Sequence, residues 1–316
     1  MGNKTLILLV VFAVVVAAAL IGYGDFRETL RQLGNFPVSH LFAALALASL
    51  NYFLRFVRWT YYLNVLEVKI PLALGALVFL SGLAMSITPG KLGEILKCYL
   101  LRDRAGVPVS TSLPVVVMER LTDLVAVIML GLVGLALLPT PVLITLSVAL
   151  AICGGLFLVL TSRHSQRLVD LPLLRRWKSE LLTSQESLKL LTAPRVMLVA
   201  VALGAVAWFS EGLALWVILQ GLDGPLVIYR VLPIYAASTL VGAITAMPGG
   251  LGGTEGSMVA LLQQSGLAPD VASAGTLIVR VVTLFFAVLV GLAALLWVKR
   301  VRDTGLPESS TMRTKG

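Results

Sequence analysis

Long uninterrupted apolar runs constrain this chain more than any other feature. Residues 6–23 and 124–138 contain no charged side chain, and a helix needs roughly 20 apolar residues to cross about 30 Å of hydrocarbon. Hydrophobic residues make up 58% of the chain and charged residues only 13%, which is more apolar surface than one soluble core can bury. The pattern predicts an all-α polytopic membrane protein, because an outer-membrane barrel would show short alternating strands instead.

The apolar runs predict about eight membrane segments. We expect them near residues 5–22, 40–60, 71–88, 110–138, 142–161, 196–220, 228–247 and 270–298. Between the fifth and the sixth, residues 162–195 carry seven lysines and arginines, and we expect an amphipathic segment on the cytoplasmic surface. Residues 299–316 are polar and predict a disordered cytoplasmic tail.

The basic residues predict an orientation. If every apolar run crossed the membrane, the basic stretches 55–69 and 97–104 would face opposite sides. The conflict disappears if residues 71–101 form a hairpin that enters from the cytoplasm and returns, and residues 228–265 form a second hairpin from the outer side. Twenty of the 25 lysines and arginines then face the cytoplasm and three face outward, with both termini cytoplasmic.

This topology predicts two inverted repeats, residues 1–138 and 139–298. Each repeat has two spans, a re-entrant hairpin broken at a Pro-Gly pair and a further long span, and the second repeat runs in the opposite sense. Inverted repeats with discontinuous helices are typical of transporters and place the binding site near mid-depth.

Both hairpin breaks combine proline, which ends a helix, with glycine, which lets the backbone turn or approach a ligand closely. A half-helix that restarts after the break directs its N–H groups toward mid-depth, where a phosphate or carboxylate suits them. The alternative interpretation is that the breaks are only packing kinks. The candidate substrate-binding residues at the breaks are Pro89, Gly90, Lys91, Gly93, Glu94, Pro248, Gly249, Gly250, Gly252, Gly253 and Glu255.

Charged residues deep in two spans extend this candidate site. They are Glu119, Arg120, Asp123 and Arg280. Charges inside a membrane are costly, face the protein interior and usually pair. Glu119 and Asp123 are four residues apart and share a helix face, whereas Arg120 is expected to point elsewhere. We expect both arginines to pair with some of these carboxylates and the glutamates after the breaks, either to bind substrate or as a purely structural network.

Three further side chains have two interpretations each. Glu211 lies deep in a span, where it either lines the same cavity or donates, as a neutral acid, to Ser210 or Asn51. Arg55 and Arg58, next to a tryptophan, are more simply interfacial anchors, and contact with a lipid phosphate is the alternative.

No metal, cofactor or nucleic-acid site is expected. Neither His40 nor His164 has a second ligand at metal-binding spacing, and two cysteines cannot form a disulfide framework. The net charge of +9 comes from basic residues at the ends of apolar runs, which suits anionic lipid better than nucleic acid. No Walker loop, nucleophile elbow or dinucleotide fingerprint is present, so no catalytic residue is predicted.

Several motifs resemble the lysylphosphatidylglycerol synthase transmembrane family, the flippase portion of the multiple peptide resistance factor. They are residues 86–94, 119–123 and 248–256, together with Arg280, and the resemblance covers nearly the whole chain. It implies a bacterial or archaeal cytoplasmic-membrane protein related to domains that translocate aminoacylated phospholipid. Some family members look like partners of lipid or polyprenyl-linked glycosyl metabolism. The soluble aminoacyl-transferase domain of the full synthase is not found in this sequence, so synthase activity is not expected.

These observations lead to three functional hypotheses. The first is a flippase-like transporter that holds the headgroup of a phospholipid or polyprenyl phosphate in a midplane polar cavity. The second is an accessory scaffold that binds a lipid-synthesising or glycosyl-transferring enzyme through residues 162–195. The third and least expected is an integral-membrane enzyme that uses the buried carboxylates.

Overall fold

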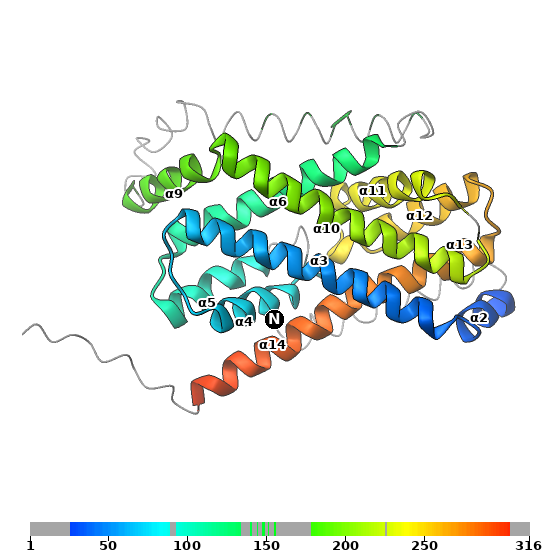
Figure 1. Ribbon diagram of the computed structural model, residues 1–316, viewed down its shortest axis with the longest axis horizontal. Helices are drawn as coiled ribbons and strands as arrows, with labels where there is room; N and C mark the ends of the chain where they lie inside the picture. Colours follow the sequence, from blue (N-terminus) through cyan, green and yellow to red (C-terminus); the bar gives the residue numbers. More distant parts are fainter. Residues whose placement is uncertain are drawn as a thin grey trace, which may run out of the picture.

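The computed structural model describes residues 26–88, 93–133, 178–224 and 226–303, with isolated positions between 140 and 155. Within these residues the chain is helical and contains no strand (Figure 1). Several predictions fall outside them: the span at 5–22, most of the segment 142–161, residues 162–177 and the tail beyond 303.

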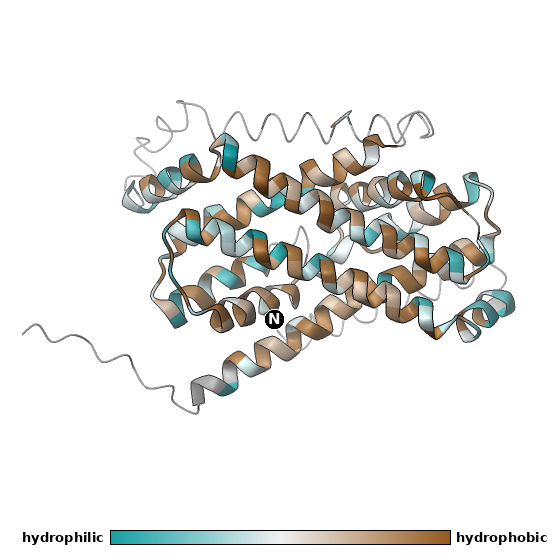
Figure 2. Cartoon of the chain, viewed as in Figure 1, coloured by the Kyte–Doolittle hydropathy of each residue, from teal (hydrophilic) through white to brown (hydrophobic). Residues whose placement is uncertain are grey.

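Three helical stretches of the described chain are long and apolar enough to cross a membrane, which confirms an all-helical membrane protein. They are α3 (Val38–Val65), α10 (Pro194–Gly221) and Pro269–Val298. α3 and α10 pack side by side along their length (Figure 1). Hydrophobic residues cover much of these helices (Figure 2), as contact with hydrocarbon requires.

Proline marks where most of these helices begin, because its fixed φ suits the first turn and its missing N–H costs nothing there. It precedes or opens α3, α10 and α6 (Val109–Leu132), as well as α4 (Leu72–Leu83) and the last span. The residues are Pro37, Pro71, Pro108, Pro194 and Pro269.

Two short helix pairs enter the bundle from opposite ends (Figure 1). The first consists of α4 (Leu72–Leu83) and α5 (Leu96–Ala105). The second consists of α11 (Ile228–Ile244), the 3-10 turn η4 (Pro248–Gly250) and α12 (Gly253–Gln264). α4 has 12 residues and is too short to cross about 30 Å at 1.5 Å per residue. The second pair is interrupted at η4, whereas residues 89–92, which contain the predicted break of the first pair, lie outside the described residues.

The last span changes its geometry in the middle. α13 (Pro269–Arg280) passes into a five-residue π-helical turn, η5 (Val281–Phe285), and then into α14 (Phe286–Asp303). The Tyr52 hydroxyl on α3 donates a 2.7 Å hydrogen bond to the Thr283 carbonyl within this turn. α13 packs on α2 (Phe26–Gly34) and α12, whereas α14 packs on α4.

Small residues allow the helices to approach closely around the hairpins. A Cβ atom on Gly291 of α14 would overlap the backbone of Ala84 at the end of α4. Gly242 of α11 lies in the same way against the Thr254 side chain of α12. In a membrane, contacts of this kind hold helices together by van der Waals packing. The two hairpins are therefore tightly seated, and their inner ends meet the long spans at mid-bundle.

Candidate functional site

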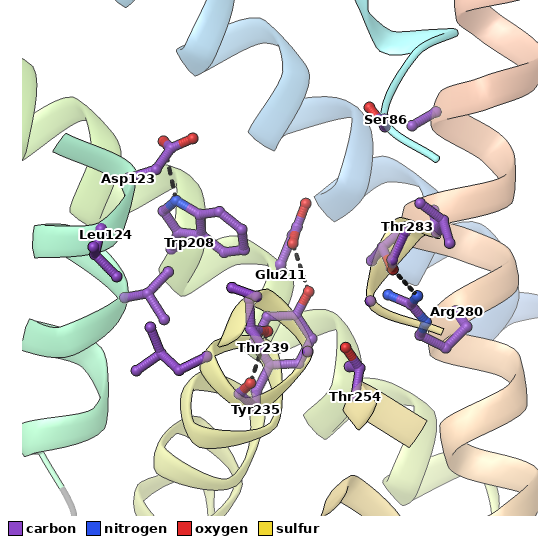
Figure 3. Close-up of a pocket in the computed structure, with 18 of the residues that line it drawn as sticks. Ser86, Asp123, Leu124, Trp208, Glu211, Tyr235, Thr239, Thr254, Arg280 and Thr283 are labelled. Carbon is purple, nitrogen blue, oxygen red and sulfur yellow. Dashed lines mark hydrogen bonds between the residues drawn. The ribbon is translucent and has the colours of Figure 1, made fainter. Parts of the chain in front are cut away.

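A cavity of about 300 Å³ lies where the inner ends of the two hairpins meet α3, α6, α10 and the last span. Figure 3 shows its side chains converging from these elements. The apolar part of the wall includes Leu124, Val127, Leu240 and Leu284. The polar part consists of Tyr52, Arg55, Ser86, Thr88, Arg120, Asp123, Trp208, Glu211, Tyr235, Thr239, Thr254, Arg280 and Thr283.

The second hairpin break forms one wall of the cavity. Gly249, Gly250 and Gly252 have φ angles of 62°, 68° and 84°, a left-handed conformation that glycine adopts without steric cost. A Cβ on Gly249 would lie 3.4 Å from the Ile87 side chain, so this break touches the residues just before the first break. Pro89, Gly90 and Lys91 themselves lie outside the described residues.

Arg280 and Glu255 close the second break. Arg280 Nε lies 2.5 Å from Glu255 Oε1, and its Nη2 donates to the Gly249 carbonyl at 2.6 Å. The second oxygen of Glu255 accepts a hydrogen bond from the Gly252 N–H at 2.6 Å. This glutamate therefore caps α12 and holds the arginine at the same time, so the helix N-terminus is already occupied by a carboxylate.

Glu94 and Arg120 form the corresponding pair beside the first break. Arg120 Nη2 lies 2.8 Å from Glu94 Oε2 and 3.2 Å from Asp123 Oδ2. In both halves a glutamate after the break thus pairs with an arginine on the following long helix, at separations of 26 and 25 residues. The expectation that Arg120 points away from Asp123 is wrong, because residues three apart on a helix are also neighbours.

Arg55 and Arg58 are buried, so the interfacial-anchor interpretation of these arginines is wrong. They are 5% and 0% exposed, and the adjacent Trp59 is 1% exposed. Arg58 Nη2 lies 2.5 Å from Asp123 Oδ1. Because α3 continues for ten residues beyond Arg55, this side chain lies well inside the helix and not at its end. Contact with a lipid phosphate remains a prediction.

Lys97 is a third buried cation, and its sequence position indicated a charge in a cytoplasmic loop. Its Nζ lies 2.6 Å from Glu119 Oε2 and 5.4 Å from the centre of the Phe79 ring. Lys97 and Glu119 are 2% and 0% exposed. Lys97, Arg55 and Arg58 are buried. The predicted orientation therefore depends on the other 17 of the 20 lysines and arginines expected to face the cytoplasm.

Glu211 faces the cavity, and its partner is one that the sequence did not indicate. It accepts a 2.5 Å hydrogen bond from the Tyr235 hydroxyl. Ser210 and Asn51, the two partners considered from sequence, donate to the Ala207 carbonyl at 2.7 and 2.8 Å. Three residues before Glu211 on the same helix, the Trp208 indole nitrogen lies 3.2 Å from Asp123 Oδ1.

The predicted site residues therefore divide into two groups. Five line the cavity: Arg120, Asp123, Gly249, Gly250 and Arg280. The other predicted residues that the structure describes do not line the cavity and make contacts next to it. They are Gly93, Glu94, Glu119, Pro248, Gly252, Gly253 and Glu255. Sequence reasoning missed Tyr52, Trp208 and Tyr235 as lining residues, and their only sequence signal is that polar aromatics occur in apolar helices beside charged residues.

Chemically, the cavity combines three arginines, Arg55, Arg120 and Arg280, with hydroxyl donors and an apolar wall. Arginine presents a planar fork of N–H donors that matches phosphate or carboxylate oxygens. Asp123 and Glu211 are the two carboxylates in the wall. This arrangement suits an anionic group that carries further polar and apolar parts.

Comparisons with known proteins cover this same region. The family described as the lysylphosphatidylglycerol synthase TM region matches residues 10–291. A UPF0104 membrane protein of Methanothermobacter thermautotrophicus is 23% identical, over 93% of this chain and 96% of the relative. A second protein of that description from the same organism is 24% identical, over 93% and 94% of the two chains. A UPF0104 membrane protein of Methanocaldococcus jannaschii is 28% identical, over 65% of this chain and 90% of the relative.

Proposed function

This chain belongs to the lysylphosphatidylglycerol synthase transmembrane family, and from that premise we propose that it is a flippase-like lipid transporter. It binds the headgroup of a phospholipid or polyprenyl phosphate in the central cavity and moves it between leaflets. The observation that carries the proposal is the convergence of Arg55, Arg120 and Arg280 from three helices on one cavity. The apolar part of the cavity wall favours a lipid over a fully polar anion, because the headgroup of a lipid is attached to apolar chains.

We further propose that the chain consists of two inverted repeats with about eight membrane segments. The α4–α5 and α11–α12 pairs enter from opposite ends (Figure 1). Each contains a glutamate that pairs with an arginine on the following long helix, at nearly the same separation. Inverted repeats of this kind place a site between two halves that rock against each other. The cavity between the hairpins would then open to each leaflet in turn.

The arginines of the two equivalent pairs provide the test of transport. We expect Arg120→Ala and Arg280→Ala to abolish transfer of a fluorescent phospholipid across the bilayer of reconstituted vesicles, and Glu94→Gln and Glu255→Gln to reduce it. The physical reason is that Arg120→Ala removes a guanidinium donor to the headgroup, whereas Arg280→Ala removes the contacts with Glu255 and the Gly249 carbonyl that hold one wall of the cavity. Dithionite quenching of labelled lipid in each leaflet measures the transfer.

Arg102→Ala is the matched control, because the Arg102 side chain is 53% exposed and pairs with its exposed neighbour Asp103. It should transfer lipid as the wild type does. Melting curves on the same samples identify variants that lose transfer because they unfold. Normal transfer by well-folded Arg120→Ala and Arg280→Ala variants would refute headgroup binding at this site.

An accessory scaffold is the second candidate, and α9 (Lys178–Leu191) favours it. This helix packs on α6 but leaves Leu182 and Leu190 47% and 49% exposed. A lipid-synthesising or glycosyl-transferring enzyme is the partner that this hypothesis predicts. If the transfer assay fails for the wild type, the scaffold becomes the better account.

We also propose that the protein lies in the cytoplasmic membrane of a prokaryote with both termini inside. Single cysteines at Glu180 of α9 and Arg31 of α2, in a background lacking Cys98 and Cys153, test this orientation. A membrane-impermeant maleimide added to intact cells should label Arg31→Cys at once and Glu180→Cys only after lysis. The reverse pattern would overturn the orientation and leave the cavity unaffected.

A further inference from the structure

Arg55 differs in its contacts from the other buried or half-buried cations of the described bundle interior. Within the described chain, Arg58, Lys97, Arg120 and Arg280 each have a carboxylate oxygen within 2.8 Å. The Nη2 of Arg55 lies 3.7 Å from one oxygen of Glu94 and 3.7 Å from one oxygen of Asp123, beyond hydrogen-bond distance. Its Nε is buried and makes no hydrogen bond to any part of the protein that the structure describes.

The position of Arg55 makes these uncommitted donors accessible to a ligand. Arg55 is 5% exposed and lines the cavity. Arg58, one turn further along α3, is 0% exposed and is absent from the cavity wall. Arg120, which lies beside the same two carboxylates as Arg55, also has a buried Nε without a hydrogen bond among the described residues. A buried donor without a partner costs free energy, so an acceptor oxygen bound in this corner would remove that cost.

Arg280, in contrast to Arg55, uses two of its donors in short hydrogen bonds within the protein. Its Nε and Nη2 are both occupied, by Glu255 at 2.5 Å and by the Gly249 carbonyl at 2.6 Å. These bonds hold the η4 turn and the start of α12 together. An incoming anion would have to break them before it gained the same donors.

We propose that the three cavity arginines divide their roles: Arg55, helped by Arg120, is the receptor for a phosphate ester, and Arg280 is a positioning residue for the second hairpin. The proposal rests on the proposed function and specifies which group of the site holds the headgroup. The acceptor is a phosphate oxygen, because a tetrahedral phosphate presents oxygens to two guanidinium groups at once. Glu94 and Asp123, each 3.7 Å from Arg55, then neutralise the guanidinium when no ligand is bound.

Affinity and transfer measured on the same purified protein test this division. The probes are dihexanoyl phosphatidylglycerol, dihexanoylglycerol without the phosphate, and dimethyl phosphate without the tails. We expect the wild type to bind the first probe most tightly. Arg55→Gln should lose about tenfold or more in affinity for it, as expected for a charge-assisted hydrogen bond, and Arg55→Lys, which keeps the charge but not the planar fork, should be intermediate.

Arg280→Gln should bind the first probe within about twofold of the wild type but transfer lipid much more slowly, a split that a general loss of folding would not produce. Arg102→Gln is the matched surface control and should change neither quantity. Unchanged affinity in a folded Arg55→Gln variant would overturn the proposal, as would an equal loss of affinity in Arg280→Gln. The Arg55→Lys variant keeps the test valid if Arg55→Gln does not fold.

The same probes separate this inference from the function on which it rests. If the wild type neither binds nor transfers lipid, the transporter hypothesis fails. If it does both and Arg55→Gln binds normally, only the role of Arg55 fails. Equal affinity of the wild type for dimethyl phosphate and for the lipid, lost in Arg55→Gln, would support Arg55 as the receptor and assign the site to a soluble phosphate ester.

Discussion

Replacing Lys97 by methionine is expected to lower the free energy of unfolding by about 3–5 kcal/mol, the cost of leaving one partner of a buried ion pair without the other. The substitution strands Glu119, which is 0% exposed and whose Oε2 lies 2.6 Å from the lysine nitrogen. Water cannot reach the carboxylate, and methionine fills the space of the lysine stem but offers no charge. Equilibrium unfolding in mixed micelles, followed by tryptophan fluorescence, measures the change.

The double variant Lys97→Met, Glu119→Gln should recover most of this loss, because removing both charges also removes the cost of burying them. Lys189→Met is the matched control: this lysine is exposed in the last turn of α9, and its replacement should change the free energy by less than about 0.5 kcal/mol. A Lys97→Met protein as stable as the wild type would show that the pair does not hold α5 to α6.

Gly291→Ala is expected to destabilise the protein by about 3 kcal/mol, the upper end of the usual cost of overpacking. The added methyl group would overlap backbone atoms of Leu83 and Ala84, which cannot rotate away as a side chain can. α14 must then move away from α4, and the inner end of the first hairpin loses its support. The same unfolding experiment measures the effect.

Gly256→Ala on α12 is the control with the opposite sign. Nothing lies within 4 Å of a Cβ at this position, and alanine is the better helix former by about 0.8–1 kcal/mol. The pair of variants therefore separates crowding from helix propensity. Stabilisation by both substitutions would mean that α4 and α14 do not pack as the structure has them.

Much of the framework could be predicted from the sequence because hydrophobic length and Pro-Gly breaks are local signals. The second break, at Pro248–Gly250, lies between α11 and α12. Carboxylate partners for Arg120 and Arg280 are predictable because an intramembrane charge requires compensation. The structure supplies such partners for both, in Glu94 and Glu255. The role of these pairs in binding remains a prediction.

The misplaced residues share one physical cause, which is that their partners are distant in the sequence. Arg55 and Arg58 follow an apolar run and look like snorkelling anchors, and Lys97 looks like a loop charge. Arg55 lies between Glu94 and Asp123 of α6, and Lys97 pairs with Glu119 of α6. Arg58 pairs with Asp123 and lies against Gly204 of α10. Before the hairpin is placed, a buried cation and an interfacial one have the same sequence signature.

The π-helical turn after Arg280 determines how the side chains of α14 are rotated relative to those of α13. A π turn carries one residue more than the α-helical turn it replaces, and one residue corresponds to about 100° of rotation around a helix axis. Without that residue, the face of α14 that carries Gly291 would swing away from Ala84 while α13 kept Arg280 in the cavity. The π turn therefore sets the rotation of α14 relative to α13. Arg280 on α13 can face the cavity while Gly291 on α14 faces α4.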